Sequence, residues 1–504
     1  MEIPREYNAA VDLIGRNLAA GRGGKTVFID DGGSCTYAEL AERVDRAANV
    51  LLSMKIMREE RIAIAMLDSA DWVALFLGAI KAGIVPVALN TLLTPKDYEY
   101  QLKDSRSKAV FVSDPLLKNF ENFAFTKIIS HGKFKEMLSA ASAKADAAST
   151  TRDDMCFWLY SSGSTGAPKG TVHLHSHLIL TAELYAKGVL GMRESDVVFS
   201  AAKLFFAYGL GNSMTFPLAV GASTVLMAER PTPDSVFKRL VEKRPTIFFG
   251  VPTLYAAMLA SPAFPKKDDL KLRACISAGE ALPPELGKRF SERTGVELLD
   301  GIGSTEMLHI FLSNRPGDVR PGTTGKPVPG YQLRLVDDAG SVITKPGELG
   351  ELQISGPTSA IMYWNQREKT KNTFQGPWTR SGDKYSFDAD GYFTYGGRSD
   401  DMLKVSGIYV SPAEVEAALV SHESVLEAAV VGAEDENKLV KPKAFVVLKP
   451  GQSTSEKALQ EHVKSKLAPH KYPRWFEWRA SLPKNDRGKV ARKELKDELA
   501  RRRG

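Results

Sequence analysis

The chain has 504 residues, of which 43% are hydrophobic and 25% charged, and its formal net charge is +7 at pH 7. This composition is that of an ordinary globular protein, and the length exceeds the ~250–300 residues that one hydrophobic core supports, so two or more domains are expected. The charge is mild, and the sequence has no aromatic-rich RNA-binding motif or zinc-finger spacing, so we expect no nucleic-acid partner. Binding of polyanionic small molecules explains the excess of positive charge equally well.

Signals for secretion, membrane insertion and disulfide bonding are missing from the pattern. The opening residues, Met1–Tyr7, lack the apolar stretch of a signal peptide. The most apolar window, Trp72–Leu89, is interrupted by Lys81 and Pro86 and falls short of the ~20 residues that span a bilayer, so it predicts a buried helix and strand. No membrane partner is expected. Three cysteines without paired or metal-like spacing suit a reducing cytoplasm: Cys35, Cys156 and Cys275.

Short apolar runs alternate with amphipathic stretches through the first 330 residues. Examples are Arg61–Met66, Ile84–Leu89, Ala109–Ser113 and Thr246–Gly250. Apolar strands separated by helices are typical of parallel sheets that are covered on both faces. Residues 331–396 are richer in strands and turns, which predicts a small β-barrel-like part.

The pattern changes again near residue 400. From there it predicts an α+β unit, with helices over 412–421 and 456–467 and strands over 425–431 and 443–448. The charged, turn-favouring stretch Arg398–Asp401 separates the two regions. The predicted fold class is therefore α/β and α+β, with an N-terminal domain over residues 1–399 and a C-terminal domain over residues 400–504.

The stretch Tyr160–Gly170 combines three glycines and four serine or threonine hydroxyls with one lysine. Glycines let consecutive N–H groups point inward as an anion nest, and the hydroxyls and Lys169 add further donors, which predicts a phosphate-binding loop. The β-favouring runs Met155–Tyr160 and Thr171–His173 predict that the loop joins two strands. A Walker A loop would need Ser or Thr after the lysine, where this chain has Gly170. A flexible surface linker, the alternative, would not need the Pro-Lys-Gly ending.

Five segments resemble, in order, the signature elements of the adenylate-forming superfamily, which contains acyl- and aryl-CoA synthetases, peptide-synthetase adenylation domains and beetle luciferases. They are Tyr160–Gly170, Gly301–Glu306, Trp378–Asp383, Gly397–Gly407 and Pro483–Lys489. The resemblance implies a large N-terminal domain and a mobile C-terminal cap. It also implies that ATP, Mg²⁺ and coenzyme A are used to convert a carboxylic acid to an acyl-adenylate plus pyrophosphate, and then to a thioester and AMP.

The resemblance implies a nucleotide site in the N-terminal domain. The phosphate loop would hold the β- and γ-phosphates, Asp383 would accept hydrogen bonds from both ribose hydroxyls, and Arg398 would contact ribose or phosphate. Ile302 lies in the implied adenine slot, where the family usually has a stacking aromatic residue. The implied nucleotide-binding set is Ser161, Ser162, Gly163, Ser164, Thr165, Gly166, Lys169, Gly170, Ala278, Gly279, Glu280, Asp300, Gly301, Ile302, Thr305, Asp383 and Arg398.

Lys489 is the implied catalytic lysine. An ammonium group on a loop can reach the α-phosphate and a carboxylate oxygen together and stabilise the charge that develops there. A run of solvated lysines is the alternative, but Pro483 and Gly488 favour the functional interpretation. Asn485 and Arg487 depart from the family pattern.

Glu306 is implied to act in catalysis by ligating Mg²⁺, an ion that proteins often hold through one or two carboxylates and the phosphates of the substrate. The hydroxyls of Thr165 and Thr305 would contribute beside it. A lone Gly-Ser-Thr-Glu would be interpreted as a solvated acid after a turn. Its register with the other elements favours the functional role.

Thioester formation needs a second surface near the acyl carbon. In the family the cap rotates about a hinge aspartate, here Asp400, which withdraws the lysine and brings the 404–410 loop to the site. Lys404, Ser406 and Gly407 would then border the coenzyme A channel, where a residue without a side chain permits close approach. Four lysines could meet the coenzyme A phosphates, although an exposed lysine is the simpler interpretation of each: Lys404, Lys441, Lys443 and Lys471.

The acid substrate is indicated by two pairs of segments. Lys203–Asn212, which is aromatic and small, and Met307–Ile310 strongly resemble benzoate-CoA ligases. Tyr7–Asp12 and Gly21–Lys25 are closer to 4-hydroxybenzoate-CoA ligases. An aryl acid is therefore expected, with either benzoate or 4-hydroxybenzoate as the substrate.

The implied acid pocket is small and aromatic. Ala207 and Gly209 would leave room for a flat ring, Tyr208 would form a wall, and His309 would either hydrogen-bond to a para-hydroxyl or pack against the ring. The implied acid-binding set is Ala207, Tyr208, Gly209, Gly303, His309 and Ile310.

Several alternatives stay open at this point. The chain could be a ligase for cyclohexanecarboxylate or a medium-chain fatty acid, an adenylating monooxygenase, or a stand-alone enzyme that loads a carrier protein. A non-catalytic sensor would be expected to have lost Lys489, Glu306 or Asp383, and all three are present. A homodimer also stays open.

His173, His175 and His177 alternate along the chain. On a strand they would face one way and could hold a metal ion, but no further Cys or carboxylate ligand lies near them in the sequence. The resemblance instead places one histidine here, lining the nucleotide pocket.

Overall fold

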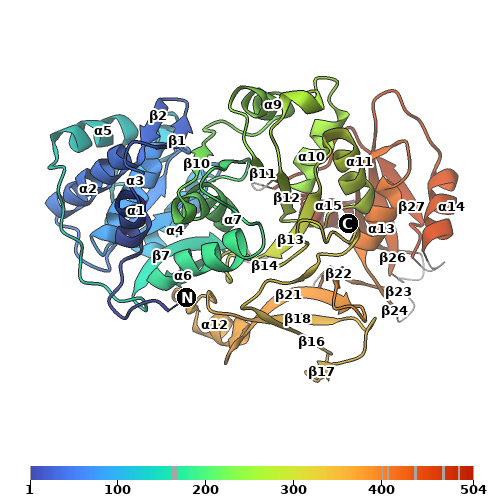
Figure 1. Cartoon of the computed structure of the whole chain (residues 1–504). Helices are drawn as coiled ribbons and strands as arrows, with labels where there is room; N and C mark the ends of the chain where they lie inside the picture. The colour runs from blue at the N-terminus through green and yellow to red at the C-terminus, as the bar shows by residue number, and fades with distance from the viewer. Residues whose placement is uncertain are drawn as a thin grey trace.

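The computed structural model describes residues 2–161, 167–399, 401–405, 408–435, 440–467, 471–485 and 488–502. These residues form two neighbouring α/β units, an antiparallel sheet beneath them and a C-terminal unit beside α10 and α11 (Figure 1). The two helices that mark this boundary are α10 (Pro252–Ala260) and α11 (Pro284–Thr294). The mixed α/β and α+β fold class predicted from the sequence is confirmed.

The first sheet has the strand order β19-β8-β7-β4-β3-β5-β6. The strands from β3 to β7 pair in parallel, whereas β8 and β19 are antiparallel to their neighbours. The predicted phosphate loop joins the hairpin β7–β8, so the prediction of a strand on either side of it is confirmed. The bounds are β3 (Arg61–Ala65), β4 (Val85–Ala88), β5 (Ala109–Val112), β6 (Lys127–Ser130), β7 (Met155–Ser161), β8 (Lys169–Leu174) and β19 (Met362–Tyr363).

Alternate residues of the central strand β3 face two different apolar clusters. Ile62 and Ile64 pack in the larger cluster with helices α1, α2 and α3, whereas Ala63 and Ala65 pack with Tyr98 of α4. Burial on both faces explains why Ile62–Ala65 is apolar throughout. The helices are α1 (Ala9–Ala19), α2 (Tyr37–Ser53), α3 (Ala70–Lys81), α4 (Pro95–Ser105), α5 (His131–Ala140) and α6 (His175–Thr181).

The second sheet has the strand order β15-β14-β13-β12-β11-β9-β10-β1-β2. In this order the strands from β13 to β1 pair in parallel, whereas β2, β14 and β15 are antiparallel to their neighbours, so β11, β12 and β13 end at one edge of the sheet. Ligands of α/β proteins bind outside the carboxyl ends of such strands. The bounds are β1 (Thr26–Asp30), β2 (Gly33–Thr36), β9 (Val197–Ser200), β10 (Ser223–Val225), β11 (Ile247–Gly250), β12 (Ala274–Ala278), β13 (Leu298–Gly303), β14 (Ile310–Ser313) and β15 (Lys326–Pro327).

The strand-rich segment that follows forms an antiparallel sheet of order β17-β16-β18-β21-β20, with β22 also paired to β21. The sequence predicted a barrel-like part over 331–396. Within the described residues the strands instead form an open sheet, because its two edge strands do not pair with each other. It carries Asp383 and Arg398, which are register partners on β21 and β22. The bounds are β16 (Gln332–Val336), β17 (Val342–Ile343), β18 (Gly350–Ser355), β20 (Phe374–Gln375), β21 (Trp378–Phe387) and β22 (Phe393–Arg398).

The C-terminal unit contains a three-stranded sheet, β25-β26-β27, and a short hairpin, β23–β24. Its two apolar clusters consist only of residues from Leu403 onward, so this unit has a core of its own. The helices and strands predicted here lie where the sequence indicated. The bounds are β23 (Leu403–Val405), β24 (Ile408–Val410), α13 (Pro412–Val420), β25 (Val425–Glu434), β26 (Val440–Leu448), α14 (Glu456–Lys466), β27 (Trp475–Trp478) and α15 (Arg492–Arg501).

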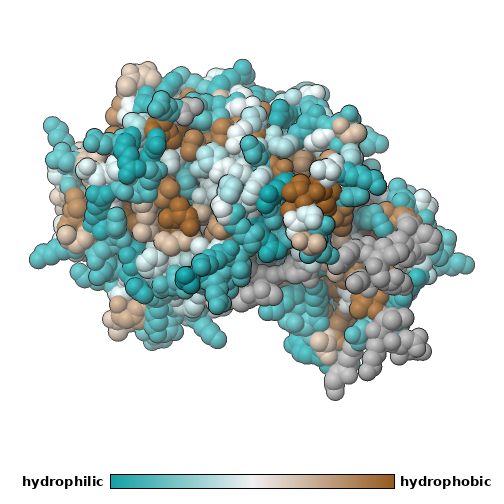
Figure 2. Space-filling view, turned by 90° about the horizontal axis from the view of Figure 1, so that it is seen from below, coloured by the Kyte–Doolittle hydropathy of each residue, from teal (hydrophilic) through white to brown (hydrophobic). Residues whose placement is uncertain are grey.

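Hydrophilic side chains cover most of the face seen in Figure 2, and apolar residues gather there only in small patches. No helix within the described ranges is long and apolar enough to cross a bilayer. The apolar window at Trp72–Leu89 instead forms α3 and β4, both buried, as the sequence predicted.

Candidate active site

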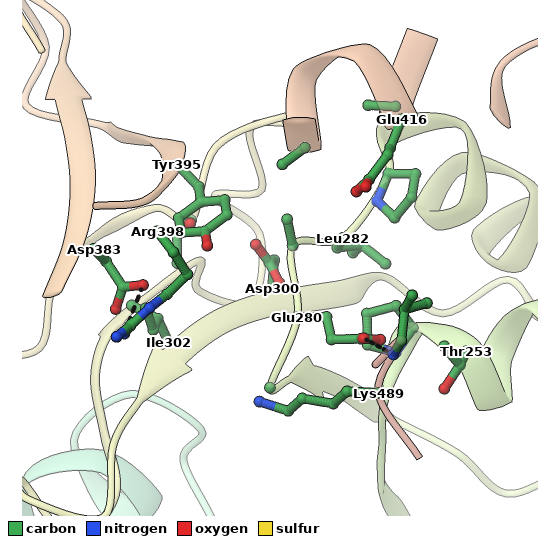
Figure 3. Close-up of a pocket in the computed structure, with 18 of the residues that line it drawn as sticks. Thr253, Glu280, Leu282, Asp300, Ile302, Asp383, Tyr395, Arg398, Glu416 and Lys489 are labelled. Carbon is green, nitrogen blue, oxygen red and sulfur yellow. Dashed lines mark hydrogen bonds and ion pairs between the residues drawn. The ribbon is translucent and has the colours of Figure 1, made fainter. Parts of the chain in front are cut away.

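A cavity of about 1060 Å³ opens between the carboxyl ends of β12 and β13, the antiparallel sheet and the C-terminal unit. Figure 3 shows side chains from all three parts converging on it. Most described members of the predicted nucleotide-binding set line this cavity: Ser161, Lys169, Gly279, Glu280, Asp300, Gly301, Ile302, Thr305, Asp383 and Arg398. Gly170 and Ala278 do not line it.

Asp300 and Ile302 on β13 form the central wall of the cavity (Figure 3). Burial raises the pKa of the Asp300 carboxyl well above its ordinary value. Its Oδ1 atom has no hydrogen-bond partner within the described part of the chain. A buried polar atom without a partner is costly, so this oxygen is suited to accept a hydrogen bond from a bound molecule.

Asp383 and Arg398 face each other across the β21–β22 pair. Arg398 Nη1 lies 3.4 Å from Asp383 Oδ1 and donates to the Ser381 carbonyl at 3.1 Å. The pair presents one acceptor carboxylate and one donor fork to the same cavity wall, which suits a ligand with both hydroxyl and phosphate groups.

Glu306 lies at the base of the phosphate loop. Its Oε1 atom accepts hydrogen bonds from Ser161 Oγ at 3.2 Å and from the Tyr363 hydroxyl at 2.7 Å. Lys169 Nζ lies 4.1 Å from the centroid of the Tyr363 ring, and burial lowers the pKa of this lysine. The two ends of the loop and Glu306 therefore meet around one tyrosine. Ser162, Gly163, Ser164, Thr165 and Gly166 lie outside the described residues.

The three histidines after the loop do not share a face of a strand. β8 ends at Leu174, and His175 and His177 begin helix α6, because Leu174 is the last residue to pair with β7. His173 donates from Nε2 to the Thr305 carbonyl at 2.8 Å and so braces the segment that carries Glu306. Among the described residues no group of three metal-binding side chains is found, so this alternative receives no support.

A second cavity, of about 480 Å³, lies beside the first. This volume falls in the ~300–1000 Å³ range of small-molecule sites. Aromatic and small residues of the predicted acid-binding set line it: Ala207, Tyr208, Gly303, His309 and Ile310. Ala278 also lines this second cavity rather than the first.

His309 is neutral and fixed in orientation. Its Nε2 atom lies 3.1 Å from Asn212 Oδ1 and 3.3 Å from the Tyr208 carbonyl; since both partners are acceptors, Nε2 carries the proton. Burial lowers the pKa of His309 to about 3. Its Nδ1 atom is buried and has no hydrogen-bond partner among the described residues, so it can accept a hydrogen bond from a bound molecule.

Gly209 was predicted to leave room for the substrate ring, but it does not line the cavity. A β-carbon at this position would lie 2.0 Å from the Lys203 carbonyl oxygen, so the glycine is required by the contact with that backbone. Tyr208 does form a wall, and its hydroxyl is tied to the sheet through the Ile276 carbonyl at 3.3 Å.

Lys489 lies where the two cavities meet, because its side chain lines both. Its loop is closed on itself: Lys489 N donates to Asn485 Oδ1 at 3.0 Å, and Asn485 N donates to the Lys489 carbonyl at 2.8 Å. The lysine therefore stands between the larger cavity, which Asp383 and Arg398 line, and the smaller one, which Tyr208 and His309 line.

Comparison with known proteins agrees with this geometry. The model of the AMP-binding enzyme family matches residues 16–364, and that of the AMP-binding enzyme C-terminal domain matches residues 414–489. The chain belongs to the AMP-binding enzyme family.

Individual members of the family are similar over nearly the whole chain. The benzoate–CoA ligase of Thauera aromatica is 61% identical over 98% of this chain and 97% of its own length. The 4-hydroxybenzoate–CoA/benzoate–CoA ligase of Rhodopseudomonas palustris is 50% identical over 98% and 94%. The solved structure of a benzoate CoA ligase from Burkholderia xenovorans LB400 superposes with a TM-score of 0.92, at 55% identity, over 97% of this chain and 99% of the other.

A solved anthranilate CoA ligase, in complex with anthranoyl-AMP, superposes with a TM-score of 0.95 at 43% identity and covers 99% of each chain. The ligase fold and the resemblance inferred from the five sequence segments are both confirmed.

The predicted hinge and coenzyme A residues lie mostly outside the described part of the chain. Asp400, Ser406 and Gly407 lie outside the described residues, and only the backbone of Lys404 is described, on β23. Two of the lysines considered for coenzyme A have carboxylate partners: Lys443 Nζ lies 2.9 Å from Glu477, and Lys471 Nζ lies 2.7 Å from Glu414.

Tyr363 is a site residue that sequence reasoning missed. It is 57 positions from Glu306 and reaches it only because β19 joins the first sheet beside β8. Its neighbourhood carries no glycine or charge pattern that would have marked it. Thr253 and the side chain of Glu280 were also missed as neighbours of the lysine loop.

Proposed function

We propose that this chain is an ATP-dependent aryl-CoA ligase that converts benzoate or 4-hydroxybenzoate to its CoA thioester. The observation that carries the proposal is the place of Lys489, which lines both the larger cavity and the smaller one with the aromatic side chains. A cation at that junction can contact an α-phosphate and a carboxylate oxygen at once. The similarity to benzoate–CoA ligases supports the aromatic acid as the substrate.

The larger cavity holds ATP. Asp383 accepts hydrogen bonds from the ribose hydroxyls, and the neighbouring Arg398 contacts the ribose or a phosphate. Asp300 Oδ1, which lacks a partner within the described residues, accepts a hydrogen bond from the adenine amino group. Ile302 provides a flat apolar contact for the base. Ser161 and Lys169 place the phosphate loop against the triphosphate.

Glu306 would hold Mg²⁺ at this site together with the phosphates of the nucleotide. Glu306 offers one carboxylate that is oriented by Ser161 and Tyr363, and oxygen ligands of this kind suit an ion that is otherwise held by phosphates and water. When bound, the ion supplies charge neutralisation at the phosphate oxygens. His173 keeps the Thr305–Glu306 segment in place through the Thr305 carbonyl.

The smaller cavity holds the aromatic acid with its carboxylate toward Lys489. Tyr208 and the neutral ring of His309 enclose the aromatic ring, and Ala207 leaves space for it. A carboxylate oxygen then attacks the α-phosphorus, the bond from that phosphorus to the bridging oxygen breaks, and pyrophosphate leaves. The ammonium group of Lys489 stabilises the charge that develops on the phosphoryl and carboxylate oxygens.

Thioester formation follows a rotation of the C-terminal domain, residues 400–504, about Asp400. The separate apolar core of this unit allows it to move as one body. The rotation removes Lys489 and brings the segment with Lys404, Ser406 and Gly407 to the acyl carbon. The coenzyme A sulfur attacks that carbon, and AMP leaves.

A panel of acids tests the proposal. Pyrophosphate release and thioester formation would be measured with benzoate, 4-hydroxybenzoate, cyclohexanecarboxylate and octanoate, each with and without coenzyme A. We expect the two aryl acids to have the highest kcat/KM in both assays. Pyrophosphate release without any thioester would contradict the coenzyme A assignment and favour a carrier-loading enzyme. A higher kcat/KM for octanoate than for the two aryl acids would contradict the aryl specificity.

A further inference from the structure

Glu280 follows the carboxyl end of β12, in the segment that the sequence placed in the adenine slot. Its side chain takes another direction: Figure 3 shows the carboxylate pointing toward Thr253 and the lysine loop rather than toward Asp383. There its Oε1 atom accepts a hydrogen bond from the Val490 backbone N–H at 3.2 Å. The partner is the residue directly after Lys489.

A second contact holds the other side of the lysine. Thr253 Oγ1, in the first turn of α10, donates to the Gly488 carbonyl at 3.3 Å. Thr253 and Glu280 follow β11 and β12, which are adjacent parallel strands. The backbone on both sides of Lys489 is therefore attached to one rigid edge of the second sheet.

The charges of Glu280 and Lys489 are opposite, which favours the docked position of the lysine loop. Glu280 is largely buried, and burial raises the pKa of its carboxyl, while the positive charge of Lys489 and the Val490 N–H act in the opposite direction. Elsewhere in the C-terminal unit, Lys484 pairs with Glu427 at 2.6 Å, which ties the start of the loop to β25. Within the described residues, Glu280 reaches the loop from the N-terminal side through the Val490 N–H.

We propose that Glu280 is a positioning residue for the adenylation step, which, together with Thr253, docks the lysine loop so that the ammonium group stands between the two cavities. The inference rests on the proposed role of Lys489. Docking is needed only while the lysine acts, so loss of Glu280 slows adenylate formation and leaves the second step, in which the loop has withdrawn, unaffected. A residue that only bound adenine would instead change the KM for ATP.

The test measures the two half-reactions of the full chain separately, with four variants. Adenylation is followed as benzoate-dependent pyrophosphate release, and the second step as thioester formation from supplied benzoyl-adenylate and coenzyme A. Glu280→Ala removes the acceptor, Glu280→Gln keeps an oxygen that can accept the Val490 N–H, and Thr253→Val removes the second contact. Glu292→Gln, on the exposed face of α11, is the control with the same change in charge.

We expect Glu280→Ala to lower kcat of adenylation at least tenfold and Thr253→Val to lower it less, with KM for ATP changed by no more than about threefold. Glu280→Gln should recover most of the rate. Thioester formation from supplied benzoyl-adenylate should equal that of the wild type, which also shows that the variants are folded. The inference is overturned if Glu280→Ala slows both steps equally, or if it raises KM for ATP with kcat unchanged. A wild-type chain that forms no adenylate would contradict the proposed function instead.

Discussion

Lys489 fills the space that Gly279 leaves empty. The lysine Cε lies 3.3 Å, and its Nζ 3.6 Å, from the position that a β-carbon on residue 279 would take. Gly279 also has a φ of +98°, which L-residues with a side chain rarely adopt. The glycine therefore permits both the backbone turn after β12 and the close approach of the lysine side chain to the site.

Replacing Gly279 with alanine should slow adenylation at least about tenfold, because the methyl group displaces the lysine and the turn is strained by roughly 1–3 kcal/mol. The measurement is kcat for pyrophosphate release with benzoate. Gly287→Ala on α11 is the control, since its β-carbon would meet the nearest atom, Leu282 Cδ2, at an ordinary 3.5 Å. Equal rates in the wild type and Gly279→Ala would contradict the role of this close approach.

Tyr363→Phe should raise the Mg²⁺ concentration needed for half-maximal activity, because Glu306 loses the hydroxyl that orients it at 2.7 Å. A lost hydrogen bond to a charged group corresponds to about 1.5–3 kcal/mol, so a shift of roughly tenfold or more is expected. The measurement is a Mg²⁺ titration of pyrophosphate release. Tyr331→Phe removes a hydroxyl bonded to Thr358 at the same distance but away from the cavity, and should leave the titration unchanged. A Tyr363→Phe titration that matches the wild type would show that Glu306 does not depend on this contact.

Gly211→Ala should narrow the acid cavity. A β-carbon there would lie 2.4 Å from His309 Cδ2, so the imidazole must move toward the substrate ring. Overpacking of this kind costs about 1–3 kcal/mol, and a para-substituted acid needs more space than benzoate. We expect kcat/KM to fall further for 4-hydroxybenzoate than for benzoate. Gly15→Ala in α1, with no atom within 4 Å of the added carbon, is the control. An unchanged ratio between the two acids would place the para position away from His309.

The buried His175 should make the fold sensitive to acid. Its Nδ1 accepts the Ala9 N–H at 3.1 Å, and burial lowers its pKa from 6.5 to about 4. Between these two values the unfolded chain binds a proton that the folded chain does not, so the free energy of unfolding falls as the pH is lowered below 6.5.

His175→Asn keeps an acceptor without a titrating group. Between pH 7.5 and pH 5.0 it should therefore lose about 2 kcal/mol less stability than the wild type does. Chemical denaturation at the two pH values measures this difference. If both proteins lose the same stability, His175 does not titrate in the manner that its burial indicates.

Local chemistry made much of this architecture predictable. The hairpin β7–β8 could be inferred because its apolar strands flank a run of glycines and hydroxyls, and the units around residues 1–330 and 401–504 differ in the spacing of their apolar residues. Glu306, Asp383 and Lys489 could be named because each belongs to a short segment that the family shares.

Contacts between distant segments could not be predicted in the same way. Tyr363 reaches Glu306 only through the pairing of β19 with β8, and the Glu280 carboxylate finds Val490 N only once the C-terminal unit is placed beside α10. Gly209 was misjudged because sequence shows that a residue is small but not which neighbour requires it; here that neighbour is the Lys203 carbonyl. The alternative that His173, His175 and His177 share one strand face could be tested only in the structure, where β8 ends at Leu174 and His175 begins α6.

The most direct test of the account is the Lys489→Ala variant, measured in both half-reactions beside the wild type. We predict that benzoate-dependent pyrophosphate release falls by a factor of at least about 100, in line with the loss of one charged transition-state contact, while supplied benzoyl-adenylate is still converted to benzoyl-CoA at the wild-type rate. Pyrophosphate release that survives the substitution, or a loss of both steps together, would contradict the claim that Lys489 at the junction of the two cavities drives adenylation.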